Sequence, residues 1–225
     1  MRRPKAEKIR PANDAVAGSV PPPVRAGVER GRADTRRRLL EAAAAELVAG
    51  DGALEIGDVA RRAGVSVGLS YHYFGSKAGL IAAVVEDFYD RFDASVMAIN
   101  PQPGVDWGRR EQRRLQAMVA FHYAEPLSPI VLARLSREPE VAAEEARRLQ
   151  AHIELAAQNI ALAQKRGEIP ASLDPHQLGA MILGGLRQAI GQALAQAVRP
   201  DQAGIAAQLW DFIAAMARFK IVPAE

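Results

Sequence analysis

The chain has 225 residues, of which 49% are hydrophobic and 24% charged, so it can form a buried core and is not disordered as a whole. It contains 44 alanines but only six Phe, four Tyr and two Trp, a balance that favours helices over strands. The lack of cysteine excludes disulfides, thiolate catalysis and cysteine-bound zinc. No uncharged apolar run is long enough to suggest a membrane span, and the basic N-terminus lacks the apolar stretch of a secretory signal. We therefore expect a cytoplasmic protein.

Charge is distributed unevenly along the sequence. The formal net charge is +3, but residues 1–38 contain 11 Lys and Arg against four Asp and Glu, a net charge of +7. The remaining residues therefore carry a net charge of −4. A basic end on a mildly acidic body suggests contact with a polyanion at one pole, because Lys and Arg neutralise phosphates and release counterions. A solvated basic tail without a partner is the alternative.

The first predicted segment is a basic arm. Residues 1–31 contain five prolines, several glycines and almost no large apolar side chain, so we expect them to be disordered. From Asp34 onward, apolar residues repeat at helical spacing, which predicts a helix that ends at 50–52, a Gly-Asp-Gly sequence.

Three further helices follow in close succession. The pattern predicts a helix over 56–63 that is broken by Gly64, and a second over 67–74 that is broken by Gly75. Ser76 can cap a longer helix that continues to Phe92.

The rest of the chain is predicted to be helical almost throughout. Proline and glycine bound candidate helices at roughly 106–124, 127–137, 139–167, 174–198 and 201–220. No segment alternates apolar and polar residues with β-branched enrichment, so we predict no strand and an all-α fold.

Residues 56–74 carry the most specific pattern, two short helices joined by a tight turn. Ala60 is small where a second helix must cross closely, Gly64 permits a positive φ, and Ser66 can cap the second helix. In a helix-turn-helix of this kind the second helix enters the major groove of DNA with its N-terminal residues toward the base edges.

Several positions in and beyond this segment match a known family pattern. They are Ala60, Ala63-Gly64-Val65-Ser66, Gly68, Tyr71-His72-Tyr73-Phe74, Ser76-Lys77 and Leu80. With these residues, the segment from about Thr35 to Phe92 resembles the DNA-binding domain of TetR-family transcriptional regulators, and the rest of the chain is similar in size and helical layout. The resemblance implies a helix-turn-helix domain over 32–92 and a ligand-binding and dimerisation domain over 93–225. It also implies a homodimeric repressor that binds a palindromic operator in double-stranded DNA and is released by a small-molecule effector.

Two positions depart from the family's usual pattern. The family usually has Thr or Ser near position 56, where the first helix of the motif meets a phosphate, but this chain has Ile56. An apolar residue usually stands at position 70, whereas here Ser70 follows Leu69, as if the two were exchanged. Whether Leu69 packs inward or faces the groove is left open by the sequence.

The resemblance places DNA contacts around the start of the second motif helix. Val67 or Leu69 could touch a thymine methyl group, and His72 could contact a base or a phosphate. The Tyr71 hydroxyl is expected on a phosphate, although Tyr71 and its aromatic neighbours could instead be core residues. A cation at Lys77 opposes the dipole of the following helix, which favours a phosphate opposite it. The predicted DNA-binding residues are Thr35, Arg36, Ser66, Val67, Gly68, Leu69, Tyr71, His72 and Lys77.

The last two predicted helices carry apolar stripes that suggest a subunit interface, with core helices of one chain as the alternative. The resemblance implies that they form a four-helix bundle with their symmetry mates. The predicted interface residues are Ile182, Leu186, Ile190, Leu194, Leu209, Phe212, Ile213 and Met216.

Polar and aromatic groups of the central helices could line an effector cavity, although each could equally be a core or solvated residue. The candidates are Trp107, Phe121, His122, Tyr123, Arg134, His152, Asn159 and Arg187. The histidines lack acidic or histidine neighbours at metal-binding spacing, so we predict no metal site and no cofactor.

Two other classes of function are alternatives to a repressor. A sequence-neutral architectural DNA-binding protein would bind through its basic arm and lose affinity steeply with salt. An enzyme is not predicted, because the sequence has no Gly-rich phosphate loop, G-x-S-x-G elbow, H-E-x-x-H helix or paired carboxylates.

Overall fold

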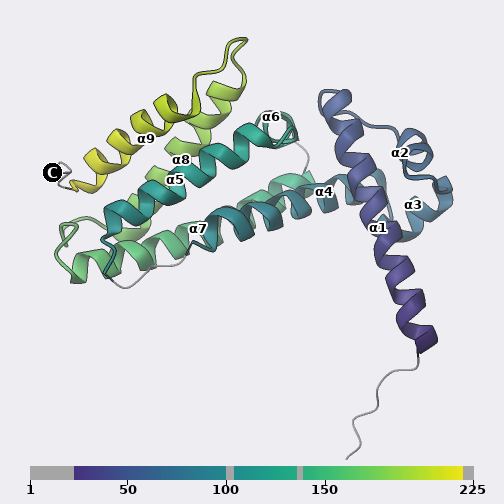
Figure 1. Ribbon diagram of the computed structural model, residues 1–225, viewed down its shortest axis with the longest axis horizontal. Coiled ribbons are helices and arrows are strands. Elements are labelled where there is room, and N and C mark those ends of the chain that lie inside the picture. Colours follow the sequence, from purple (N-terminus) through teal and green to yellow (C-terminus); the bar gives the residue numbers. More distant parts are fainter. Residues whose placement is uncertain (1–22, 100–103, 136–138, 220–225) are drawn as a thin grey trace, which may run out of the picture.

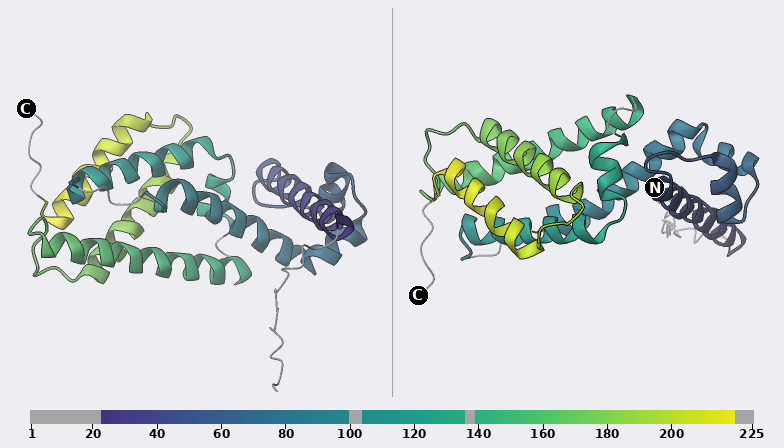
Figure 2. Two further views of the ribbon diagram at one scale, coloured as in Figure 1. Left: turned by 60° about the horizontal axis from the view of Figure 1, so that its bottom comes forward. Right: turned by 90° about the horizontal axis from the view of Figure 1, so that it is seen from above.

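A computed structural model of the chain describes residues 23–99, 104–135 and 139–219. This part of the chain is helical and contains no strand, which confirms the all-α prediction. Helices α1, α2 and α3 lie together at one end of the molecule, and α5, α7, α8 and α9 form a larger bundle at the other end (Figure 1). Helix α4 runs between the two parts (Figure 2). Within the described ranges, no helix is both long and apolar enough to cross a membrane.

The first helix, α1 (Pro23–Ala49), begins earlier than the sequence pattern predicted. Residues 1–22 of the expected disordered arm lie outside the described residues, but 23–31 form the first turns of α1, so disorder was the wrong prediction for them. Extending an existing helix backward costs little because nucleation is already complete, and proline is tolerated at the first helical position.

The three short helices lie where the sequence placed them. They are α2 (Ile56–Ala63), α3 (Val67–Phe74) and α4 (Lys77–Phe92). A π-helical turn, η1 (Asp93–Met97), continues α4 and was not predicted.

The C-terminal helices also match their predicted positions, with some shorter than expected. They are α5 (Trp107–Ala124), α6 (Ser128–Ala133), α7 (Pro139–Lys165), α8 (Pro175–Leu194) and α9 (Gln202–Ala217). Asp106, Asp174 and Asp201 cap α5, α8 and α9 by accepting a hydrogen bond from the backbone three residues later.

The buried side chains form two clusters, one at each end of α4. The first cluster combines apolar residues of α1, α2 and α4 with Leu127, Ile130, Val131, Leu135 and Val141. The helix-turn-helix end therefore shares its core with α6 and with the start of α7, and the domain boundary at 92/93 stays a prediction. The second cluster fills the bundle of α5, α7, α8 and α9.

Candidate nucleic-acid interface and ligand cavity

The turn between α2 and α3 has the geometry of a helix-turn-helix. Gly64 ends α2 with a φ of 66° and a ψ of 40°, a left-handed conformation that glycine adopts without steric cost. Two residues later, the Ser66 hydroxyl accepts a hydrogen bond from the Leu69 backbone N–H at 3.2 Å and begins α3. The turn fixes how α3 crosses α2, and it leaves the start of α3 on the surface.

The outer face of α3 combines apolar and polar side chains in solvent. Val67 and Tyr71 are 44% and 49% exposed. Ser66, Gly68 and His72 are exposed beside them. Five of the predicted DNA-binding residues thus share one accessible face, on a helix narrow enough to enter a major groove.

The structure answers the question about Leu69 and Ser70. Ser70 is 1% exposed, and its hydroxyl oxygen has no hydrogen-bond partner among the described residues, whereas Leu69 is only half-buried. A polar side chain therefore takes the core position that is usually apolar in the family, and Leu69 lies at the edge of the exposed face.

The remaining predicted contacts flank this face. The Lys77 ammonium lies 3.1 Å from a carboxylate oxygen of Glu55, so its charge already has a partner in the free protein. The Thr35 hydroxyl donates to the Gly31 carbonyl at 2.9 Å, and the Arg36 guanidinium lies 5.7 Å from the centre of the Phe74 ring. The Ile56 side chain is buried in the core and has no hydrogen-bonding group for a phosphate.

A cavity of about 240 Å³ lies in the C-terminal bundle, between α4, α5, α7 and α8. Three predicted pocket residues line it: His122, His152 and Arg187. Tyr89 and Glu145 also line it, and the sequence analysis missed both because their helical spacing resembled that of core or solvated positions.

The cavity wall contains a hydrogen-bonded triad from three helices. Arg187 of α8 donates to the Tyr89 hydroxyl at 3.0 Å and to Glu145 Oε1 at 2.9 Å, and Tyr89 of α4 donates to the same oxygen at 3.1 Å. Burial raises the pKa of Tyr89 to about 12, so this hydroxyl keeps its proton. The triad ties α4 to the bundle at the cavity.

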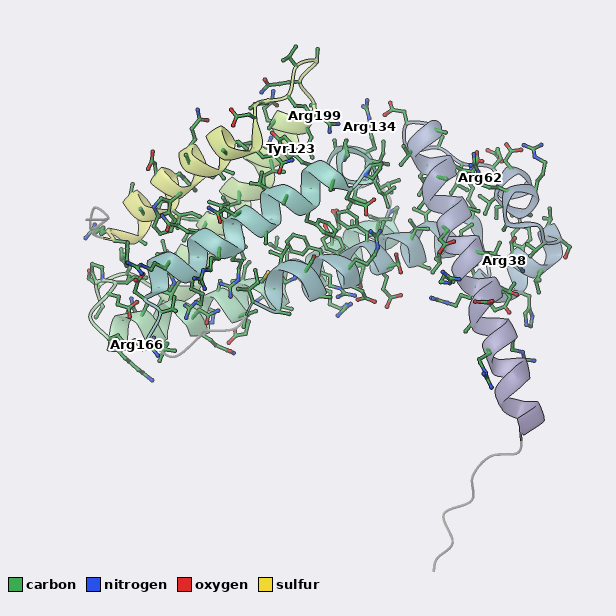
Figure 3. All side chains as sticks on the ribbon, viewed as in Figure 1. Arg38, Arg62, Tyr123, Arg134, Arg166 and Arg199 are labelled. Atoms are coloured by element: carbon green, nitrogen blue, oxygen red, sulfur yellow. The ribbon has the colours of Figure 1, made fainter. Side chains whose placement is uncertain are left out.

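The other predicted pocket residues lie elsewhere. Trp107 and Asn159 line a separate, smaller cavity of about 50 Å³. Phe121 packs against both core clusters. The Tyr123 hydroxyl donates to the Pro200 carbonyl at 3.0 Å, and Arg134 forms an ion pair with Asp51 at 3.0 Å, on the side of α6 that faces α1 (Figure 3). Neither Tyr123 nor Arg134 lines the larger cavity.

Comparisons with known proteins agree with this geometry. The family model described as "Bacterial regulatory proteins, tetR family" matches residues 39–84. The HTH-type transcriptional regulator BetI of Escherichia coli is 40% identical over 70 residues, which are 31% of this chain and 34% of that regulator. The chain thus spans about a third of the length of the curated relatives it matches.

Solved structures extend the likeness beyond the N-terminal helices. A TetR-family transcriptional regulator from Rhodococcus sp. superposes with a TM-score of 0.64 and 25% identity, over 82% of this chain and 99% of that one. Residues 39–84 thus match the TetR family, and the chain has the fold of TetR-family regulators. FadR from Bacillus subtilis, solved with stearoyl-CoA, has the same fold at a TM-score of 0.69 and 14% identity, over 80% of this chain and 98% of that one.

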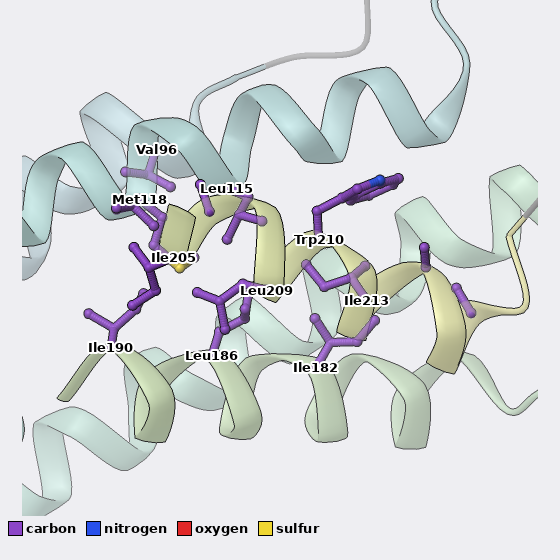
Figure 4. Close-up of a cluster of buried hydrophobic side chains, with 14 of the residues drawn as sticks. Val96, Leu115, Met118, Ile182, Leu186, Ile190, Ile205, Leu209, Trp210 and Ile213 are labelled. Atoms are coloured by element: carbon purple, nitrogen blue, oxygen red, sulfur yellow. The ribbon is translucent and has the colours of Figure 1, made fainter. Parts of the chain in front are cut away.

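Most of the predicted interface residues face inward. Six are buried in the core of their own chain: Ile182, Leu186, Ile190, Leu194, Leu209 and Ile213. Figure 4 shows the apolar side chains of α8 and α9 pointing toward each other and toward α5. The alternative of core helices is therefore correct for these six. Met216 is half-buried, and Phe212 is 39% exposed.

The exposed side of the same two helices has an apolar patch of its own, formed by Met181, Gly184, Gly185 and Phe212. Met181 is 51% exposed. The Phe212 ring lies over Gly185, where an added Cβ would stand 2.8 Å from its nearest atom. The sequence signal for this patch was the Gly184-Gly185 pair, of which Gly185 is covered by Phe212 and Gly184 has open space beside it.

Proposed function

We propose that this protein is a homodimeric transcriptional repressor that binds a palindromic operator in double-stranded DNA and acts in the cytoplasm. The observation that carries the proposal is the exposed face of α3, which follows a tight left-handed turn and presents Val67, Gly68, Tyr71 and His72 together. Base edges in the major groove offer hydrogen-bonding groups to His72 and thymine methyl groups to Val67. Ser66, Tyr71 and Lys77 contribute phosphate contacts that fix the register, with Thr35 and Arg36 on the flanking backbone.

The proposed dimer forms through the patch of Met181, Gly184, Gly185 and Phe212. Gly184 has open space where a side chain would stand, which allows two α8 helices to approach closely. The exposed apolar side chains of Met181 and Phe212 gain free energy when a symmetric copy covers them. A twofold dimer would present two α3 helices to half-sites about 34–36 Å apart, which is one turn of DNA.

The proposed effector site is the 240 Å³ cavity. Its wall includes Tyr89 of α4, the helix that also belongs to the core of the helix-turn-helix end. Two states of the dimer would differ in the distance between the two α3 helices. A ligand that binds more tightly to the state that does not fit the operator releases DNA, through a coupling free energy of about 1–3 kcal/mol. A relative's structure, FadR with stearoyl-CoA, supports a bound effector in a protein of this fold.

The experiment that tests DNA binding begins with a palindrome upstream of the gene. The protein should bind that duplex at least about 10³-fold more tightly than a scrambled duplex, at equal salt. His72→Ala should change the order of preference among operator variants. Lys77→Ala should weaken binding to all duplexes by a similar factor and flatten the salt dependence. Equal affinity for every duplex would instead indicate the architectural class of DNA-binding protein.

The dimer is tested separately. Phe212→Glu places a charge in the patch and should yield a monomer by sedimentation, with the operator affinity reduced at least about tenfold. Gln196→Glu, an exposed substitution beyond the end of α8, is the matched control and should leave a dimer. A dimer that persists in Phe212→Glu would place the subunit interface elsewhere.

A further inference from the structure

The charges that face the 240 Å³ cavity already occur in pairs. The Arg187 guanidinium is bonded to Glu145, and His152 Nε2 lies 2.6 Å from an oxygen of Asp93. His122 shares a hydrogen bond of 3.1 Å with Ser128 through Nδ1. Burial, together with the nearby Arg187 charge, lowers the pKa of His122 to about 4, so this ring is uncharged at neutral pH. The described wall therefore offers no uncompensated charge to a ligand.

The triad still has hydrogen-bonding capacity on both sides. Glu145 Oε1 accepts the bonds from Tyr89 and Arg187, while no described residue donates to Oε2. Arg187 uses two of its N–H groups in the triad, and a guanidinium has five. A ligand group that donates and accepts at once can therefore bond to the carboxylate and to the guanidinium without separating them.

The rest of the wall is apolar. Its apolar lining residues are Phe92, Met118, Leu132, Ala142, Ala146, Leu149, Leu183 and Ile190. An apolar cavity of about 150 Å³ holds benzene, so a volume of 240 Å³ has room for about ten non-hydrogen atoms.

We propose that the cavity binds a compact, uncharged, mainly apolar molecule with one amide or hydroxyl group, which Arg187 and Glu145 recognise together. The inference rests on the proposed function in that it assigns the effector to this cavity. A ligand carboxylate has only hydrogen-bond acceptors and therefore cannot bond to the Glu145 carboxylate. A ligand cation such as an amidinium has only donors and cannot bond to the Arg187 guanidinium. Either must be desolvated without gaining a free opposite charge, which selects against both.

The test uses three planar probes with the same number of non-hydrogen atoms. Benzamide is uncharged and both donates and accepts, benzoate is an anion that only accepts, and benzamidine is a cation that only donates. Each probe is titrated with the full-length protein, and binding is monitored through the NMR signals of the probe. Benzamide should bind at least about tenfold more tightly than either ion. Tighter binding of benzoate or benzamidine than of benzamide would overturn the proposal.

Two variants test whether the pair sets this preference. Glu145→Gln leaves the Arg187 charge uncompensated and should improve benzoate binding at least about tenfold. Arg187→Gln leaves the Glu145 charge and should improve benzamidine binding by a similar factor. The matched control is Glu154→Gln, on the same helix as Glu145. It removes a carboxylate from an exposed ion pair with His176 of α8 and should change neither affinity. Unchanged preferences in both cavity variants would contradict recognition by the pair.

Operator affinity measured on the same samples separates the two proposals. A protein that binds its operator selectively but binds none of the three probes overturns the ligand class and leaves the proposed repressor intact. A protein that binds benzamide selectively but never discriminates between duplexes retains the cavity and overturns the repressor.

Discussion

Ser70 shows how a single side chain can depart from the pattern that surrounds it. The sequence shows the exchange of apolar and polar residues at positions 69 and 70. It does not indicate which of the two side chains is buried, because a helix as short as α3 can accommodate either arrangement. Burial decides it: Ser70 fills the core position, and its hydroxyl has no described partner. An unsatisfied buried hydroxyl costs free energy that a methyl group would not.

Ser70→Ala should therefore stabilise the protein. We expect the free energy of unfolding to rise by about 1 kcal/mol, because the methyl group avoids the desolvation of the hydroxyl and leaves almost the same volume filled. Urea unfolding measures the change. Ser76→Ala is the control of opposite sign: it removes the 2.9 Å cap bond to Gly79 N–H and should cost about 1 kcal/mol. A loss of stability in Ser70→Ala would mean that the hydroxyl has a partner.

His122 predicts a pH dependence with a definite sign. Its pKa is lowered from 6.5 to about 4 in the folded protein, mainly by burial, so the unfolded chain binds its proton more readily. Above pH 6.5 His122 is uncharged in both states, so it costs the folded protein no stability. As the pH falls toward 4 the unfolded chain takes up the proton first, and the free energy of unfolding decreases progressively. This group should make the protein about 2 kcal/mol less stable at pH 5 than at pH 7.

The measurement is urea unfolding of the wild type and of His122→Gln at the two pH values. The wild type should lose more stability than the variant between pH 7 and pH 5, and the difference isolates His122 from the other titrating groups. Equal losses in both proteins would show that His122 titrates normally.

Among the elements, the short helices could be predicted closely and the later helix ends could not. Gly64, Ser66 and Ser76 act locally, through φ and through capping, so the sequence alone places the end of α2 and the starts of α3 and α4. The end of α8 has no comparable signal: its helix was predicted to 198 and stops at Leu194. Amphipathic stripes on α8 and α9 indicated burial but could not distinguish the side that faces the chain's own core.

Gly64 should tolerate no ordinary side chain without cost. Its φ of 66° is unfavourable for an L-residue, while only an atom of Arg38 lies within 4 Å of an added Cβ. Gly64→Ala should therefore cost about 1 kcal/mol of stability through the backbone alone. Gly57→Ala lies in α2 with open space around it and should be neutral or slightly stabilising. Thermal unfolding compares the two, and equal melting temperatures would refute the role given to the turn.

At the scale of the whole molecule, the sequence predicted the family and the two-part layout but not how the parts are joined. The likeness at residues 39–84 and the helical layout are encoded in local pattern. The pairing of Tyr89 with Glu145 and Arg187 depends on three helices meeting, and residues 56 to 98 positions apart in sequence carry no visible signal of that contact. The same holds for the Asp51–Arg134 ion pair.

Deleting residues 1–22 should reduce the affinity for DNA without changing the stability of the fold. The segment contains five Lys and Arg and two Asp and Glu, so its removal lowers the net charge from +3 to 0. The described core begins at Leu39, so the free energy of unfolding should change by less than about 0.5 kcal/mol. DNA affinity should fall and depend less on salt, as measured by titration at several salt concentrations. A large loss of stability would show that this segment packs on the core.

The apolar contacts of α6 with the first core cluster bear on how such proteins can be recombined. Leu127, Ile130 and Val131 complete a core whose other walls are α1, α2 and α4, and Arg134 reaches the turn at Asp51. A chimera joined after Phe92 would pack these α6 side chains against the helix-turn-helix end of another protein. Their shapes would no longer match, so cavities would form in the first core cluster. Hybrid regulators should therefore keep the side chains of α6 and of the start of α7 matched to the helix-turn-helix end on which they pack.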